Sequence, residues 1–115
     1  MRYNILTFSP FDRQLKRLAK KYPSLKKEYT ELLESLEREP QQGISLGNNC
    51  HKIRLAIASK GKGKSGGARV ISVFVVAENT VLLLAIFDKS EKENLTDNEL
   101  NELLKIVHEY MKRHH

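Results

Sequence analysis

The chain has 115 residues, a single cysteine and a formal net charge of +6. This length suits one domain with a modest core, and the single cysteine excludes an internal disulfide and is typical of a reducing compartment. The N-terminus lacks the apolar segment of a signal peptide, and the longest apolar run, Val81–Phe87, is too short to cross a bilayer. We therefore expect one domain over residues 1–115, in a soluble, cytoplasmic protein that does not contact a membrane.

The excess positive charge lies in one third of the chain. Residues 40–77 hold six cations and no acid, whereas the remainder holds 14 cations and 14 acids. The six cations are Lys52, Arg54, Lys60, Lys62, Lys64 and Arg69. A charge excess confined to one region is typical of a surface that binds a polyanion. The alternative is a basic loop that merely faces solvent.

The N-terminal residues predict a strand followed by a helix. Residues 3–8 favour extended structure. Ser9 is a good N-cap residue, Pro10 suits the first helical turn, and Asp12 can reach back to the cap. Apolar residues recur on one face of this helix. The opposite face carries the cations Arg13, Lys16, Arg17, Lys20 and Lys21.

A second amphipathic helix follows Pro23, which ends the first one. Ser24 can cap it, glutamates line its polar face, and Pro40 stops it. Because the two helices are joined by so few residues, we expect them to form an antiparallel hairpin.

Three strands are predicted after the hairpin. Residues 41–49 are polar with two glycines and predict a loop. Residues 50–58 then alternate between apolar and polar side chains, as in a half-buried strand. Residues 69–77 and 81–87 predict two more strands, joined by a tight turn, and a charged loop follows over residues 88–94.

A last helix begins at Thr96, with Glu99 completing a capping box and Leu95 and Leu100 placed as a hydrophobic staple. The predicted fold is α+β with the order β-α-α-β-β-β-α. The three consecutive strands form an antiparallel meander that packs on the helical hairpin. The last helix either lies on the sheet or protrudes to meet a partner.

Nucleotide and metal sites are not expected. Gly63-Lys64-Ser65 ends a P-loop motif, but the motif needs a glycine in place of Ala58 and a helix in place of the predicted strand. The four histidines and the one cysteine do not share the spacing of metal ligands. His51 lies on the apolar face of its strand, which favours a core or edge position, and Cys50 is expected to be a packing residue.

Four cations are expected to gather on one face of the sheet. Lys52 and Arg54 are two residues apart on one strand and therefore point the same way. Arg69 begins the neighbouring strand and Lys89 follows the third, with the glycine-rich segment 60–69 as a flexible lip. Crowded cations lower each other's pKa where they are desolvated, so a lysine can exchange protons while arginine binds phosphate. Such a site can stabilise a phosphoryl transition state without a metal or other cofactor.

The chain resembles the RelE/ParE toxin superfamily, and especially its HigB-like members. The resemblance rests on the element order and on three motifs, Lys52-Ile53-Arg54, Gly61–Ile71 and Phe87–Leu95, and it covers residues 3–104. It implies the toxin of a bacterial type II toxin–antitoxin module, acting as a ribosome-dependent endoribonuclease. In such toxins the 2′-hydroxyl of the message attacks the adjacent phosphate.

The resemblance also implies roles for single residues. Arg54 and Arg69 would hold the phosphate, and Lys52 or Lys89 would act as general base or acid. Docking on ribosomal RNA would fall to Lys60, Lys62 and Lys64.

The end of the third strand departs from the family pattern. Several relatives have a tyrosine or histidine near the position of Phe87. Phe87 itself can stack on a base but cannot transfer a proton. Asp88 could orient a cation or serve as a base. The identity of the proton carriers therefore stays open.

A small antitoxin is the partner that the resemblance implies. It would carry a helix-turn-helix, cover the basic face and bind operator DNA together with the toxin. Two other functions remain open, a ParE-type inhibitor of DNA gyrase that uses the helical hairpin, and a nucleic-acid-binding module without catalysis.

Overall fold

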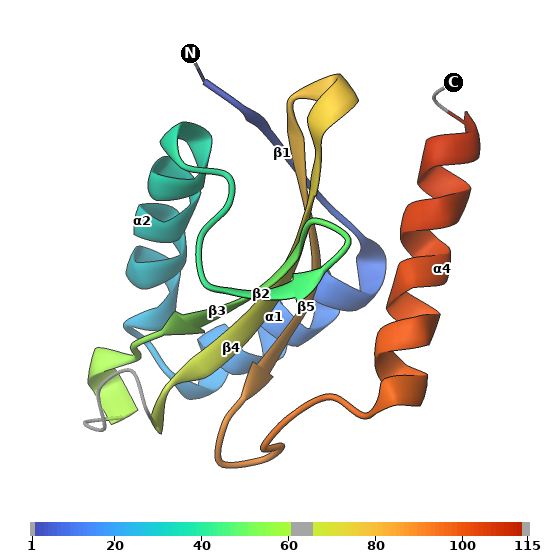
Figure 1. Ribbon diagram of the computed structural model, residues 1–115. Helices are drawn as coiled ribbons and strands as arrows, with labels where there is room; N and C mark the ends of the chain where they lie inside the picture. Colours follow the sequence, from blue (N-terminus) through green and yellow to red (C-terminus); the bar gives the residue numbers. More distant parts are fainter. Residues whose placement is uncertain (1, 61–65, 114–115) are drawn as a thin grey trace.

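The computed structural model describes residues 2–60 and 66–113 of the chain. At its centre is a five-stranded sheet with the order β1-β5-β4-β3-β2 (Figure 1). The strands are β1 (Asn4–Thr7), β2 (Ile44–Gly47), β3 (Cys50–Leu55), β4 (Ala68–Val75) and β5 (Thr80–Asp88). The helices are α1 (Ser9–Lys21), α2 (Leu25–Arg38) and α4 (Asp97–Arg113), with short 3-10 segments η1 (Ala58–Lys60) and η2 (Val76–Glu78). The predicted α+β class and element order are confirmed, with one additional strand.

The additional strand is β2, in a segment predicted as a loop. It pairs antiparallel with β3 through a two-residue turn at Asn48 and Asn49, whose φ angles are +53° and +60°. Two consecutive left-handed residues are what a tight hairpin turn requires, and asparagine tolerates that conformation. The Asn-Asn pair was therefore a usable sequence signal. The loop prediction was wrong because β2 is short and exposed, and its backbone pairing with β3 keeps it extended.

The sheet itself is mixed. The strands β3, β4 and β5 form the predicted antiparallel meander. The first strand, β1, pairs with β5 in parallel, so β5 lies inside the sheet and is buried along most of its length. This parallel pairing was not predicted, because it joins segments about 75 residues apart, Asn4 with Thr80 being one pair.

Helices cover the two faces of the sheet unequally. The hairpin of α1 and α2 packs on one face, where its buried residues Phe11, Leu18, Leu25, Leu32 and Leu36 meet side chains of β3, β4 and β5. The other face is covered in part by α4, through Val107 and Tyr110. Figure 1 shows α2 and α4 on opposite sides of the sheet. The last helix therefore lies on the sheet and does not protrude.

The helix starts agree only partly with their sequence signals. The backbone N–H of Asp12 donates to the carbonyl of Phe8 at 2.9 Å, so α1 begins one residue early and Ser9 is not its cap. The Thr96 capping box is confirmed, since the N–H of Glu99 donates to Thr96 Oγ1 at 3.1 Å and the N–H of Thr96 donates to Glu99 Oε1 at 2.9 Å. None of the described helices is long and apolar enough to span a membrane.

Candidate phosphate-binding site

Three side chains lie side by side across the central strands. In the antiparallel ladders Arg54 of β3 pairs with Arg69 of β4, and Arg69 pairs with Phe87 of β5. Directly paired residues point to the same face, with Cβ atoms about 4.5–5.5 Å apart. This face is opposite the helical hairpin, because the sequence neighbours Ile53 and Val70 belong to the hairpin core. The structure thus brings Arg54 and Arg69 together.

The environments of these two arginines differ. Arg54 is exposed, whereas Arg69 is only 5% exposed and donates from Nη1 to the carbonyl of Ala68 at 3.1 Å. Burial lowers the pKa of Arg69 below its ordinary value, and the nearby charge of Arg54 lowers it further. A desolvated guanidinium beside a second one binds an anion strongly, because the anion relieves their repulsion in a region of low dielectric.

Lys52 extends this cationic pair along β3. It lies two residues before Arg54 on the same face, is partly exposed, and pairs with Ile71 of β4 and Ile44 of β2. With Arg54 it lines a shallow hollow of about 400 Å³ beside β2. This face of the sheet therefore carries three neighbouring cations, of which Arg54 is exposed, Lys52 is partly exposed and Arg69 is buried.

Lys89 lies at the end of β5. Its backbone N–H donates to the carbonyl of Gly67 at 3.0 Å, which continues the pairing of β4 and β5. Its Nζ donates to the carbonyl of Glu93 at 3.3 Å, within the following loop. The described contacts do not join Lys89 to the other three cations, so its place in the site stays a prediction.

Lys60 is an ion-pair residue and not an exposed docking residue. Its side chain is only 6% exposed. Its Nζ donates to Asp88 and to Ser90 Oγ, the latter at 3.1 Å, and lies 5.1 Å from the ring centroid of Tyr22. That Lys60 docks on RNA stays a prediction, and in this structure these groups enclose its ammonium. The other two expected docking residues, Lys62 and Lys64, lie outside the described residues.

Asp88 is the centre of this network. Its carboxylate is fully buried and accepts hydrogen bonds from Tyr22 Oη at 2.5 Å, Ser90 Oγ at 2.7 Å and the Ser90 N–H at 2.9 Å. Burial alone raises the pKa of Asp88, but the hydrogen bonds from Lys60, Tyr22 and Ser90 outweigh it and hold the pKa well below its usual range. Asp88 thus orients a cation, as one reading of the sequence held. Asp88 cannot take a proton from an RNA bound beside Arg69, because its carboxylate faces α1 on the other side of the sheet.

Phe87 is a packing residue in this structure. It is only 7% exposed and belongs, like Leu84 and Val107, to the core cluster that includes residues of α4. That Phe87 stacks on a base therefore stays a prediction, and in this structure its ring is buried.

Sequence reasoning missed the close approach at Gly67. A Cβ at this position would overlap the carbonyl oxygen of Leu55, so only glycine lets β4 begin this near to β3. The register at Arg69 depends on that approach. The glycine-rich composition was the available signal, but it did not indicate which glycine makes the contact.

His51 and Cys50 occupy buried positions in the sheet. Within residues 2–60 and 66–113 no three His, Cys, Asp or Glu residues are grouped so as to hold a metal ion. His51 is buried and pairs with Ser72 across the ladder, as its core placement predicted. Burial raises the pKa of the Cys50 thiol, which makes it less reactive.

Comparison with protein families gives one match that covers most of the chain. A family model described as "RelE toxin of RelE / RelB toxin-antitoxin system" matches residues 11–115.

Solved structures of RelE toxins are similar to this fold. An arginine double mutant of the E. coli toxin RelE in the free state is 14% identical to this chain, with a TM-score of 0.63. The match covers 93% of this chain and 99% of that chain. The toxin–antitoxin complex RelBE2 from Mycobacterium tuberculosis contains a chain that is 16% identical, with a TM-score of 0.53 and coverage of 76% and 99%. At such identities the likeness concerns the fold alone.

Proposed function

The chain belongs to the RelE family of toxins of toxin–antitoxin systems, and from this premise we propose that it cleaves messenger RNA on the ribosome. The observation that carries the proposal is the pair of Arg54 and Arg69 on the sheet face opposite the helical hairpin, Arg54 being exposed and Arg69 buried. A non-enzymatic inhibitor would not need a desolvated arginine there. The same site could bind RNA without cleaving it, and the experiment below separates the two.

The proposed reaction needs no metal. The 2′-oxygen of one nucleotide attacks the adjacent phosphorus, and the bond from phosphorus to the 5′-oxygen breaks. A cyclic phosphate and a 5′-hydroxyl result. A base must take the proton of the 2′-hydroxyl, and an acid must give one to the departing oxygen.

In this proposal the arginines act on the phosphate. Arg54 and Arg69 bind its non-bridging oxygens and neutralise the charge that develops in the transition state. Lys52 shares their face and is the first candidate for proton transfer, with Lys89 as the second. Their order as base and acid is left open by the geometry.

We propose a cognate antitoxin as the regulating partner. The RelBE2 structure from Mycobacterium tuberculosis is a toxin–antitoxin complex, which supports an antitoxin for this chain as well. A small helix-turn-helix antitoxin that covers the basic face would block Arg54 and Arg69, and the complex would bind operator DNA. We expect the toxin to act in the cytoplasm.

The test maps messenger RNA 5′ ends after brief induction. The wild-type chain should give in-frame cuts within translated regions, with 5′-hydroxyl ends. The variants Arg69→Ala and Arg54→Ala should not. Arg38→Ala is the matched control, since Arg38 is exposed on α2 away from this face. If both site variants cleave messenger RNA as efficiently as the wild type, the assignment of Arg54 and Arg69 to the site is wrong. Intact message with blocked supercoiling would support gyrase inhibition.

A further inference from the structure

A second basic surface lies on α1. It consists of five exposed cations, here called the α1 ridge: Arg13, Lys16, Arg17, Lys20 and Lys21. The same five residues line a shallow surface hollow of about 640 Å³. Their spacing of three and four residues puts them on one side of the helix, and about 1.5 Å of rise per residue makes the row roughly 12 Å long.

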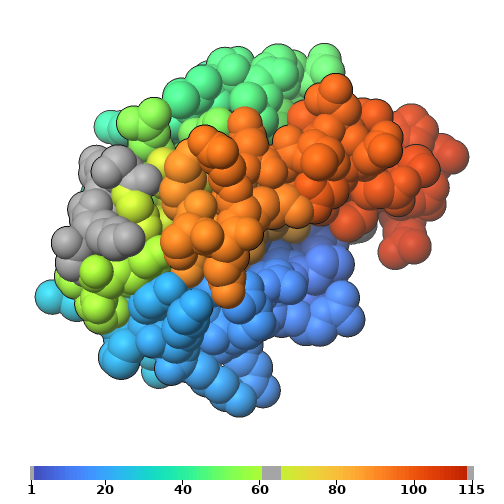
Figure 2. Space-filling view, turned by 90° about the horizontal axis from the view of Figure 1, so that it is seen from below, coloured from blue at the N-terminus to red at the C-terminus, as the bar shows by residue number. Residues whose placement is uncertain are grey.

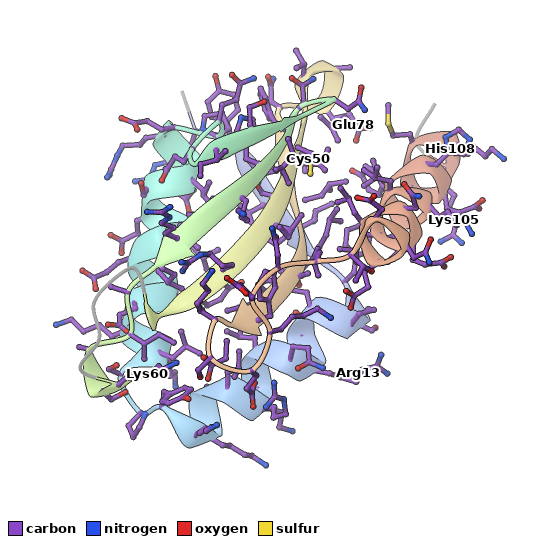
Figure 3. All side chains as sticks on the ribbon, turned by 60° about the horizontal axis from the view of Figure 1, so that its bottom comes forward. Arg13, Cys50, Lys60, Glu78, Lys105 and His108 are labelled. Carbon is purple, nitrogen blue, oxygen red and sulfur yellow. The ribbon has the colours of Figure 1, made fainter. Side chains whose placement is uncertain are left out.

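The α1 ridge is separate from the candidate phosphate-binding site. The inner face of α1 packs through Phe11 and Leu18 on the hairpin side of the sheet, whereas Arg54 and Arg69 lie on the opposite face. In Figure 2, α1 is open to solvent beside the loop between β5 and α4. Arg13 extends from α1 away from the sheet (Figure 3).

Most of the charge on the α1 ridge has no acidic partner among the described residues. Glu91 accepts hydrogen bonds from Arg17 at 2.9 and 3.1 Å, and lies 3.6 Å from Lys21 Nζ. No ion pair within the described part of the chain involves the other three cations of the ridge: Arg13, Lys16 and Lys20. A row of uncompensated cations favours a ligand with repeated negative charges.

We propose that the α1 ridge binds the phosphate backbone of ribosomal RNA, as a second contact that docks the toxin. This inference rests on the proposed function, and it gives α1 the docking role that the sequence assigned to Lys60. A protein ligand is disfavoured because the exposed residues from Arg13 to Lys21 are all polar or charged. Protein interfaces need an apolar centre and are poor in lysine, whereas a phosphate backbone needs only spaced cations.

The test compares two triple variants with the same charge change. Arg13→Gln, Lys16→Gln and Lys20→Gln remove the unpaired cations of the α1 ridge and leave the residues that hold Glu91. The matched control carries Lys26→Gln, Lys27→Gln and Arg38→Gln, three exposed cations of α2. Binding to purified ribosomes and to a short RNA duplex is measured over a salt series. Taking ~0.9 per phosphate contact, as for a double helix, the loss of three contacts should make the log–log slope of the ridge variant shallower by about 3.

Each outcome decides the proposal. A slope equal to that of the wild type, or an equal change in the α2 control, overturns it. A wild-type chain that binds neither probe also overturns it. So does a ridge variant that binds both probes as the wild type does but no longer binds its antitoxin. If the ridge variant weakens RNA binding while Arg54→Ala still cuts messages, the docking surface stands and the proposed catalytic site fails.

Discussion

Lys60 and Asp88 form a buried ion pair that joins η1 to the end of β5. Asp88 also pairs with Ala68, directly before Arg69, so the ion pair ties the start of the glycine-rich segment to the strand that carries the buried arginine. Tyr22 Oη brings the end of α1 into the same network. One carboxylate thus connects the helical hairpin with the edge of the candidate site.

Replacing Asp88 should destabilise the fold. Asp88→Asn leaves the enclosed Lys60 ammonium without a charge partner, and breaking a buried pair in this way costs about 3–5 kcal/mol. Urea denaturation measures the free energy of unfolding. Adding Lys60→Met to Asp88→Asn should recover part of the loss, because no unpaired charge is then buried. A change below about 1 kcal/mol in the single variant would contradict this role.

Acid should weaken the wild-type fold through the same carboxylate. The pKa of Asp88 is depressed in the folded state, while in the unfolded chain the same carboxyl protonates near pH ~4. The unfolded state therefore binds more protons, and the stabilisation present above pH ~4 is lost as the pH falls toward the folded pKa. Unfolding free energies between about pH 5 and pH 2 should fall more steeply in the wild type than in Asp88→Asn. Parallel curves would refute the assignment.

Arg54 should trade stability for function. It lies directly opposite Arg69, and like charges opposed across a ladder are destabilising by about 0.2–1 kcal/mol. Arg54→Gln should therefore stabilise the fold by about this amount while weakening RNA binding. Lys52→Gln is the control, since Lys52 faces Ile71 and not a cation. Thermal and urea denaturation give the comparison, and a less stable Arg54→Gln would contradict it.

Gly67 should tolerate no side chain, unlike a second glycine of the same sheet. In Gly67→Ala the new Cβ overlaps the backbone of Leu55, which cannot move without parting β3 from β4, so the loss should be about 3 kcal/mol or more. Gly47→Ala keeps a φ of +87° but has open space, so it should lose only about 1 kcal/mol. Equal losses, measured by chemical denaturation, would show that the close approach at Leu55 is unimportant.

Local patterns in the sequence determined much of the fold. Helical periodicity and a very short connection predicted the hairpin, and the Thr96–Glu99 spacing predicted a capping box that forms as expected. Strand alternation predicted the shared face of Lys52 and Arg54, and the antiparallel meander predicted that Arg69 lies beside them. Each of these features depends on residues that are near in sequence or on strands joined by one connection, so neighbouring residues suffice to encode it.

Only the tertiary structure decided which cations are free to bind a ligand. Lys60 looked like part of an open basic loop, but it pairs with a carboxylate 28 residues away, and the tyrosine that completes the network lies 66 residues from Asp88. The ring of Phe87, which the sequence allowed to stack on a base, is likewise buried in the core beneath α4. Burial depends on which distant elements pack together, and the amino-acid composition does not indicate those contacts. The sequence therefore located the excess charge, while the packing of η1, α1, β5 and α4 determined where that charge is presented.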